Sequence, residues 1–234
     1  MTTAVRFGNA FMTLTGNVDT KWLASVAGTS GSPNAAADPP FDSTVSTANV
    51  DVTQTSQVPG IGFAWIGPPI ADPKAATAMD FIADYLFDGD HGTVAAAVRK
   101  KQQDAFVNGQ FITLHNPGVL LVTVSGSTAD ALRSAITDAV TAAEQPLPAD
   151  KFNAARSAFV YHILTQTQTP SSRADNYGWY AAEGNAQYAP GDEMSEYFKA
   201  AQSLDPGYVA DIVRKYLQHP AIVQLLTSPR GSTT

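Results

Sequence analysis

The chain has 234 residues, of which 44% are hydrophobic and 15% are charged, whereas an average domain has about 25% charged residues. A chain of this length buries roughly 70–75% of its surface on folding, so its core needs no disulfide or metal. It carries 14 Lys and Arg residues against 21 Asp and Glu residues, and the net charge of −7 disfavours nucleic-acid binding. The sequence has no cysteine, which excludes disulfide scaffolds, thiolate nucleophiles and cysteine-bound metals.

The sequence shows no sign of membrane insertion or export. No apolar run approaches the ~18 residues that a membrane-spanning helix needs, so we expect no membrane span. The start of the chain, residues 1–6, has neither the basic nor the apolar region of a signal peptide. We therefore expect either a cytoplasmic protein or a piece of a longer protein, whose compartment, cytoplasm or periplasm, the composition does not decide.

Alternating apolar and polar residues predict strands along the first 125 residues and one more near the end. The predicted strands are 10–15, 50–65, 106–115, 119–125 and 221–227. Between the third and the fourth, Asn116-Pro117-Gly118 is a hairpin signal. A Gly-, Ser- and Pro-rich stretch at 28–48 cannot pack a core, and it is predicted to be a long surface loop.

Apolar residues at helical spacing predict most of the remaining chain as helix. Helices are predicted at 18–27, from Pro73 through Leu86, from Thr93 to Gln103, around 132–140, at 152–169, from a cap at Ser171, at 192–201 and from Pro206. Asp72-Pro73 and Asp205-Pro206 each place a capping carboxylate before a proline in the first helical turn. The aromatic stretch at 173–188 is predicted to be a core helix.

The order of these elements predicts the fold class. Strands that arrive in a hairpin, with helices gathered in runs, favour an α+β fold: a mostly antiparallel sheet with helices packed on one face. We expect a single domain at 10–228 that includes the loop at 28–48. A flexible start at 1–9 precedes it, and a tail at 229–234 follows it.

Histidines and carboxylates are present, but not at the spacing of a metal site. The four histidines are His91, His115, His162 and His219. No two of them are three to five residues apart, so no helix presents a pair to one metal ion. The acidic segment 88–91 is too short for a calcium loop and is predicted to be a capped turn. His162 is predicted to lie at the edge of the core with a hydrogen-bond partner.

Motifs of nucleophilic catalysis and phosphate binding are also absent from the sequence. There is no Gly-x-Ser-x-Gly segment and no Gly-rich phosphate loop, and the serine in 125–127 is predicted to cap the next helix. Arg99 is the residue of most interest, because it lies near a helix end with Lys100 and Lys101 after it. Two interpretations stay open for it: a solvated helix end that complements the helix dipole, or a binding residue.

Several local segments, in this order and spacing, resemble a known family. They are 11–23, 62–73, 89–99, 147–156, 172–174 and 205–209. Together they cover about 10–228 and resemble the insulinase/pitrilysin-type zinc metallopeptidases. The resemblance implies a LuxS/processing-peptidase-like metallohydrolase domain.

The catalytic motif of that family, His-x-x-Glu-His, is absent from its expected place on the helix that starts at Pro73. The resemblance therefore implies the C-terminal non-catalytic domain or an inactive subunit, with no catalytic residue, no cofactor, and zinc only on a partner. In that domain of active members, an Arg and a Tyr seven residues apart contact the substrate. Arg99 matches the Arg, whereas Phe106 stands in place of the Tyr and lacks its hydroxyl donor; it could equally be an inward-packed strand residue.

Two functional hypotheses follow from the resemblance. In the first, the chain is half of a substrate-enclosing clamshell that positions a peptide with Arg99 and Phe106 for a zinc-bearing homologous domain or subunit. That pairing would be a homodimer or a heterodimer. In the second, the chain is a structural or protein-binding scaffold of the same fold without a peptidase role, which Phe106 and the low charge favour.

Overall fold

The computed structural model describes residues 13–27, 50–53, 60–89, 91–101, 103–126, 129–183 and 193–226. The predicted flexible start at 1–9, the loop at 28–48, the tail at 229–234 and Asp90 lie outside these residues. The prediction that a serine in 125–127 caps the next helix also falls on residues outside them.

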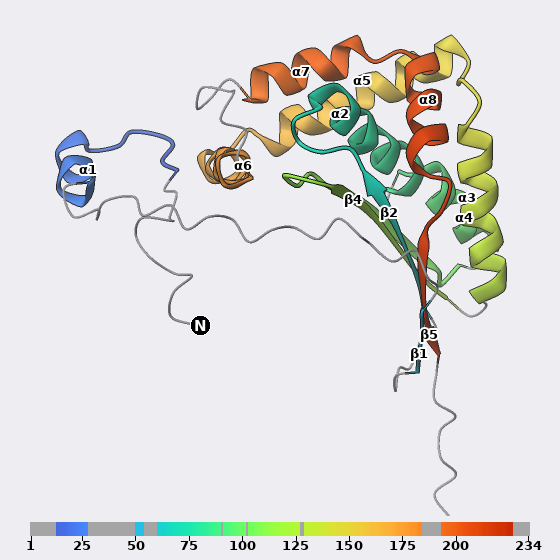
Figure 1. The fold of residues 1–234 in the computed structure, drawn as a ribbon. Coiled ribbons are helices and arrows are strands. Elements are labelled where there is room, and N and C mark those ends of the chain that lie inside the picture. The colour runs from blue at the N-terminus through green and yellow to red at the C-terminus, as the bar shows by residue number, and fades with distance from the viewer. Residues whose placement is uncertain are drawn as a thin grey trace, which may run out of the picture.

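Five strands of the described residues form one sheet in the order β1-β5-β2-β4-β3 (Figure 1). The strands are β1 (Val50–Thr53), β2 (Gly60–Gly67), β3 (Phe106–Ile112), β4 (Gly118–Ser125) and β5 (Ala221–Leu226). β2 pairs antiparallel with β4 and β5, β3 pairs antiparallel with β4, and β1 pairs parallel with β5. The predicted α+β class with a mostly antiparallel sheet is confirmed.

Helices cover one side of this sheet (Figure 1). They are α2 (Pro73–Ile82), α3 (Thr93–Lys101), α4 (Ala129–Ala143), α5 (Ala149–Gln166), α7 (Glu193–Ser203) and α8 (Pro206–Tyr216), with a π-helical turn η2 (Ala83–Phe87) directly after α2. The described residues also form α1 (Thr20–Ala27), which lies away from the sheet in Figure 1, and α6 (Pro170–Ala182). α6 lies next to the β3–β4 hairpin rather than over the sheet. None of the described helices is long and apolar enough to cross a membrane.

The core lies between the sheet and these helices. Side chains alternate along β2 and β4, and the buried set points toward the helices. On β2 this set is Ile61, Phe63 and Trp65, and on β4 it is Leu120, Val122 and Val124. Burying a large apolar side chain contributes roughly 1.5–3 kcal/mol of transfer free energy, so this layer is the main source of stability.

The two carboxylate–proline helix starts are confirmed. The Asp72 carboxylate accepts the Ala75 amide at 3.2 Å, and the Asp205 carboxylate accepts the Tyr208 amide at 2.9 Å. The cap predicted at Ser171 is wrong by two residues. The Thr169 hydroxyl accepts the Ser172 amide at 3.1 Å, because Pro170 occupies the first helical position.

Two strand predictions also need correction. The described part of the first one, 13–15, is irregular, and the Thr15 hydroxyl donates to the carbonyl of Pro170 instead of joining the sheet. The predicted strand 50–65 is two strands, because β1 runs parallel to β5 while β2 runs antiparallel to it. Alternation alone does not reveal such a reversal, since both strands share the period of two.

The ends of α3 and β3 differ slightly from the prediction. α3 ends at Lys101 rather than Gln103, and β3 ends at Ile112 rather than His115. Beyond Ile112 the chain bonds to α6: the Thr113 carbonyl accepts Trp179 Nε1 at 2.7 Å, and the His115 amide donates to Glu183 Oε2 at 2.5 Å.

Candidate functional site

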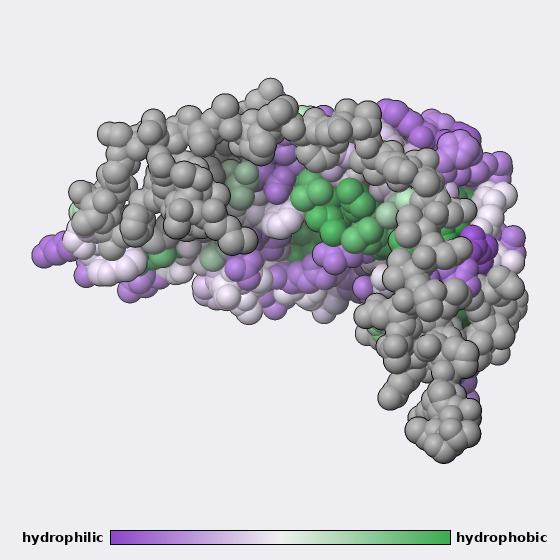
Figure 2. Space-filling model, turned by 60° about the horizontal axis from the view of Figure 1, so that its bottom comes forward, coloured by the Kyte–Doolittle hydropathy of each residue, from purple (hydrophilic) through white to green (hydrophobic). Residues whose placement is uncertain are grey.

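The sheet face opposite the helices carries apolar side chains at the surface. Leu121 of β4 is 39% exposed and Val223 of β5 is 43% exposed. The strand between them, β2, presents only small residues over its first half on this face, Gly60, Gly62 and Ala64. Figure 2 shows hydrophobic residues gathered on this side of the molecule. The open face therefore has a low strip along β2 with larger apolar side chains beside it.

Phe106 also belongs to the open face. It is the first residue of the edge strand β3, it is 57% exposed, and it pairs with Ser125 of β4. Its neighbour Val107 is the residue that points into the core, with 2% exposure. The interpretation of Phe106 as an inward-packed residue is therefore wrong, since the strand starts with its side chain on the other face.

Arg99 lies in the last turn of α3. Val94, Ala95 and Val98 of this helix are buried, whereas Arg99 is only partly buried. α3 packs against β3, the strand that begins with Phe106. The two residues that the sequence singles out thus lie on neighbouring elements, and both have side chains that reach the surface.

Two hydrogen-bonded pairs of titratable side chains lie beside the core. The Tyr197 hydroxyl donates to Asp80 Oδ2 at 2.8 Å, and His162 Nδ1 lies 2.8 Å from Asp84 Oδ1. The ring of His91 lies 5.7 Å from that of His162. His162 is thus a core-edge histidine with a hydrogen-bond partner, as predicted. The other two described histidines lie elsewhere: His115 bonds to Glu183, and His219 follows α8.

Burial raises the pKa of Asp80 to about 7, the hydrogen bond from Tyr197 opposes this rise, and the nearby Asp84 carboxylate adds to it. Burial and the Asp80 carboxylate also raise the pKa of Tyr197 well above its usual value. Asp80 therefore keeps its proton up to about neutral pH.

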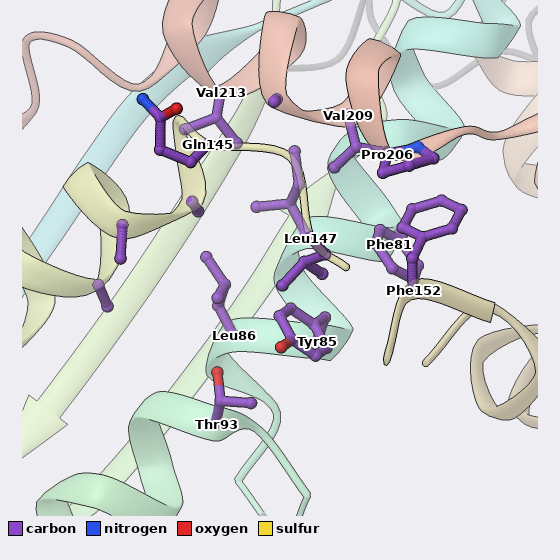
Figure 3. Close-up of a pocket in the computed structure, with 15 residues that line it drawn as sticks. Phe81, Tyr85, Leu86, Thr93, Gln145, Leu147, Phe152, Pro206, Val209 and Val213 are labelled. Carbon is purple, nitrogen blue, oxygen red and sulfur yellow. The ribbon is translucent and has the colours of Figure 1, made fainter. Parts of the chain in front are cut away.

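Two cavities lie near this group. One, of about 320 Å³, is polar and lies between α5, α6, α7 and the edge strand β3, with Asp80 and Tyr197 in its wall. The other, of about 170 Å³, is apolar and lies among α2, η2, α4 and α8 (Figure 3). Figure 3 shows Phe81, Leu86, Leu147 and Val213 around this apolar cavity, with the Tyr85 and Thr93 hydroxyls near its rim.

No protein-family model and no curated protein matches the sequence. Solved structures do match it. A protease from Helicobacter pylori aligns with 90% of this chain at a TM-score of 0.74 and 13% identity, and the peptidase M16 inactive domain from Pseudomonas fluorescens aligns with 92% at 0.69 and 14%. The inactive peptidase domain assigned to a zinc protease of Bordetella parapertussis aligns with 78% at 0.62 and 14%.

The chain has the fold of an M16 peptidase domain. It spans 54% of the H. pylori chain and 53% of the P. fluorescens chain, about half of each, but 99% of the Bordetella domain. The resemblance read from the sequence is thus confirmed at the level of the fold, which includes inactive members.

The residues of α2 do not fit a zinc ion, although zinc belongs to the catalytic M16 motif that the resemblance implies. The segment where that motif is expected, Ala75 to Phe81, offers no imidazole and a single carboxylate, that of Asp80. This carboxylate and that of Asp84 are engaged by Tyr197 and His162. No group of three or more His, Asp or Glu residues among the described residues could hold a metal ion.

The sequence did not point to Asp80 and Tyr197, and its pattern placed α6 in the core. Asp80 and Asp84 lie four residues apart on one helical face among mostly apolar residues, and that spacing was the available signal. The prediction of 173–188 as a core helix is wrong, because α6 has no buried residue and ends at Ala182. Its Trp179, 43% exposed, instead helps to line the polar cavity.

Proposed function

We propose that this chain is a non-catalytic domain or subunit of an insulinase/pitrilysin-type, or M16, metallopeptidase. It forms half of a chamber that encloses an unfolded peptide, and a homologous domain or subunit with a His-x-x-Glu-His motif supplies the zinc. The observation that carries the proposal is the open sheet face, apolar and uncovered by the described helices, on a fold that inactive M16 domains share.

The open face offers an extended peptide a place to lie. Small residues along β2 let another backbone approach closely, and Leu121 and Val223 beside them offer apolar contacts. Phe106 at the sheet edge adds an aromatic contact. Arg99 lies on α3, on the helix side of the sheet next to the edge strand β3, and would bind carbonyl oxygens or a carboxylate of the part of the peptide that passes over this edge.

The chemistry that this chain lacks must come from the partner. With no donor set for zinc in α2, the chain cannot activate a water molecule there. Its own contribution is to bind and orient the peptide, which lowers the entropic cost of reaching the partner's zinc site.

The first test uses the chain alone. Purified chain with added zinc chloride and a mixture of unfolded peptides is expected to show no cleavage that a chelator abolishes. Chelator-sensitive turnover by the chain alone would contradict the proposal.

The second test concerns peptide binding. Gly62→Val fills the low strip on the open face, and we expect the fold to tolerate it, because a Cβ added at Gly62 meets only the Val223 carbonyl, at 3.8 Å. We expect a fluorescent, carboxymethylated unfolded protein used as probe to bind the natural chain and to bind Gly62→Val at least about tenfold more weakly. The matched control is Ala158→Val on the exposed side of α5, which is expected to bind like the natural chain. Equal binding by Gly62→Val and the natural chain would contradict the proposal.

The alternative is a structural or protein-binding scaffold of the same fold. Phe106 favours it, because its exposed ring lacks the hydroxyl that active members use, and a hydrogen bond of that kind contributes about 0.5–1.5 kcal/mol. The coding sequence next to this chain discriminates between the two. A His-x-x-Glu-His chain encoded there supports the peptidase role, and its absence supports the scaffold.

A further inference from the structure

The polar cavity beside β3 combines a single charged group with aromatic walls. Asp80 contributes a partly buried carboxylate from the end of α2. Phe111 of β3, Trp179 and Tyr180 of α6, and Tyr197 of α7 contribute the aromatic rings. Among the residues that the structure describes, the lining contains no Lys, Arg or His, so no described side chain of the wall brings a positive charge to the carboxylate.

The part of the cavity wall around Asp80 presents hydrogen-bond acceptors, while Gln110 and Gln166 place amide groups farther along the wall. Among the described residues, the donor to Asp80 is the Tyr197 hydroxyl, which bonds to Oδ2. Asn176 uses its amide nitrogen on the Ser172 carbonyl at 2.8 Å, which leaves its carbonyl oxygen as an acceptor. The indole N–H of Trp179 is taken by the Thr113 carbonyl. A ligand that complements this wall is therefore a donor of several hydrogen bonds with a positive charge.

We propose that this cavity binds an alkylammonium group. The ammonium head would pair with Asp80 and donate to neighbouring oxygens, and the alkyl stem would lie against the rings of Trp179 and Phe111. The cavity volume of about 320 Å³ lies in the range that small-molecule sites occupy, roughly 300–1,000 Å³. A cation held beside aromatic faces and a carboxylate in a partly buried site is bound much more strongly than in water.

The protonation of Asp80 supports this inference. Its pKa of about 7 means that the empty cavity holds a neutral carboxyl group at mildly acidic pH, because burial disfavours an unpaired charge. A bound ammonium group would provide the missing counter-charge. The titratable groups around Asp80 are Asp84 of η2, Tyr180 of α6 and Tyr197 of α7, and His162 of α5 bonds to Asp84.

The same chemistry has two sources: a free alkylamine, or the side chain of a lysine in a peptide. The proposal does not rest on the proposed peptidase role, because a free amine needs no peptide on the open face. The probes separate the sources. n-Butylamine represents the free amine, Nα-acetyl-lysine methylamide represents the peptide lysine, and n-butanol is the neutral counterpart of nearly the same shape.

The experiment follows the Trp179 indole resonance by NMR while each probe is added to the full chain at pH 8. We expect butylamine to shift this resonance saturably and butanol to bind at least about tenfold more weakly, as the loss of a charge-assisted hydrogen bond implies. Binding of the lysine derivative at the affinity of butylamine identifies a peptide side chain as the ligand, and its exclusion identifies a free amine.

Two variants complete the test. Asp80→Asn should weaken butylamine binding about ten- to hundredfold. Asp138→Asn, which removes an exposed carboxylate of α4, should leave it unchanged. Equal shifts with butylamine and butanol overturn the proposal, and so does an equal loss in both variants. If Asp80→Asn does not fold, the comparison of butylamine with butanol on the natural chain decides alone.

Discussion

The two faces of the sheet are built from the same strands but differ in the burial of their side chains. On β4, Leu120 is fully buried under the helices, whereas the next residue, Leu121, is 39% exposed on the open face. On β2, the covered face carries Phe63 and Trp65, whereas the open face carries glycine and alanine along its first half. One face therefore supplies the stability of the domain. The other keeps apolar side chains in solvent, and these contribute little to it.

The largest expected difference between the two faces comes from shortening one leucine on each of them. Leu120→Ala is expected to lower the free energy of unfolding by about 2–5 kcal/mol, because it opens a cavity in the core. Leu121→Ala is the matched control and is expected to cost less than about 1 kcal/mol, because its side chain is already partly hydrated. Urea denaturation of both variants measures the difference. Similar losses would show that the open face is as important for folding as the covered one.

The second prediction concerns how the free energy of unfolding depends on pH through the carboxyl group of Asp80. The pKa of Asp80 is raised in the folded chain to about 7, so between pH 4 and 7 the folded chain binds a proton that the unfolded chain has lost. The free energy of unfolding should therefore fall as pH rises through this range, by about 2–4 kcal/mol, and the stability present at low pH is lost near pH 7. Other carboxylates titrate near pH 4, so the contribution is read as the difference between the natural chain and Asp80→Asn.

Asp80→Asn should be free of this component of the pH dependence. A variant that retains the full fall between pH 5 and 7 would place the raised pKa on another group.

The third prediction compares two glycines on opposite faces. A Cβ at Gly109 would lie 2.3 Å from the Cβ of Phe87, so Gly109→Ala is expected to destabilise the chain by about 1–3 kcal/mol or more. Gly62→Ala meets only a carbonyl oxygen at 3.8 Å and should change stability by less than about 0.5 kcal/mol. Thermal unfolding followed by circular dichroism distinguishes them. A large loss from Gly62→Ala would mean that the open face is covered after all.

The smallest expected effect comes from filling the apolar cavity of the helix layer. Ala139 lines this cavity, and Ala139→Leu is expected to raise the free energy of unfolding by about 0.5–2 kcal/mol. Ala158→Leu on the exposed side of α5 is the control and should stay within about 0.5 kcal/mol. Urea denaturation measures both, and a loss of stability from Ala139→Leu would show that the cavity is already closed by its neighbours.

The sequence predicts the covered face better than the open one. Asp72-Pro73, Asp205-Pro206 and the hairpin at 116–118 are local signals, and each begins or joins an element where expected. The reversal between β1 and β2 depends on β5, more than 150 residues away, and alternation within 50–65 carries no trace of it.

The candidate site is predicted only where it depends on local pattern. Arg99 and Phe106 are proposed as site residues from the resemblance alone. The face that Phe106 occupies follows from where β3 begins, and strand ends are the least certain part of a prediction. The pair of Asp80 and Tyr197 joins α2 to α7 across 117 residues. The polar cavity depends in addition on α6, whose aromatic residues look like a core helix in sequence.

The central claim is that this chain positions peptides for a zinc site on a partner. Its most direct test is the kcat/KM for cleavage of an unfolded peptide by the His-x-x-Glu-His chain encoded beside or fused to it, measured with and without this chain. The account predicts that adding the chain raises kcat/KM by at least about tenfold, and that Arg99→Ala removes most of the gain. An unchanged kcat/KM, or zinc-dependent cleavage by this chain alone, would contradict it.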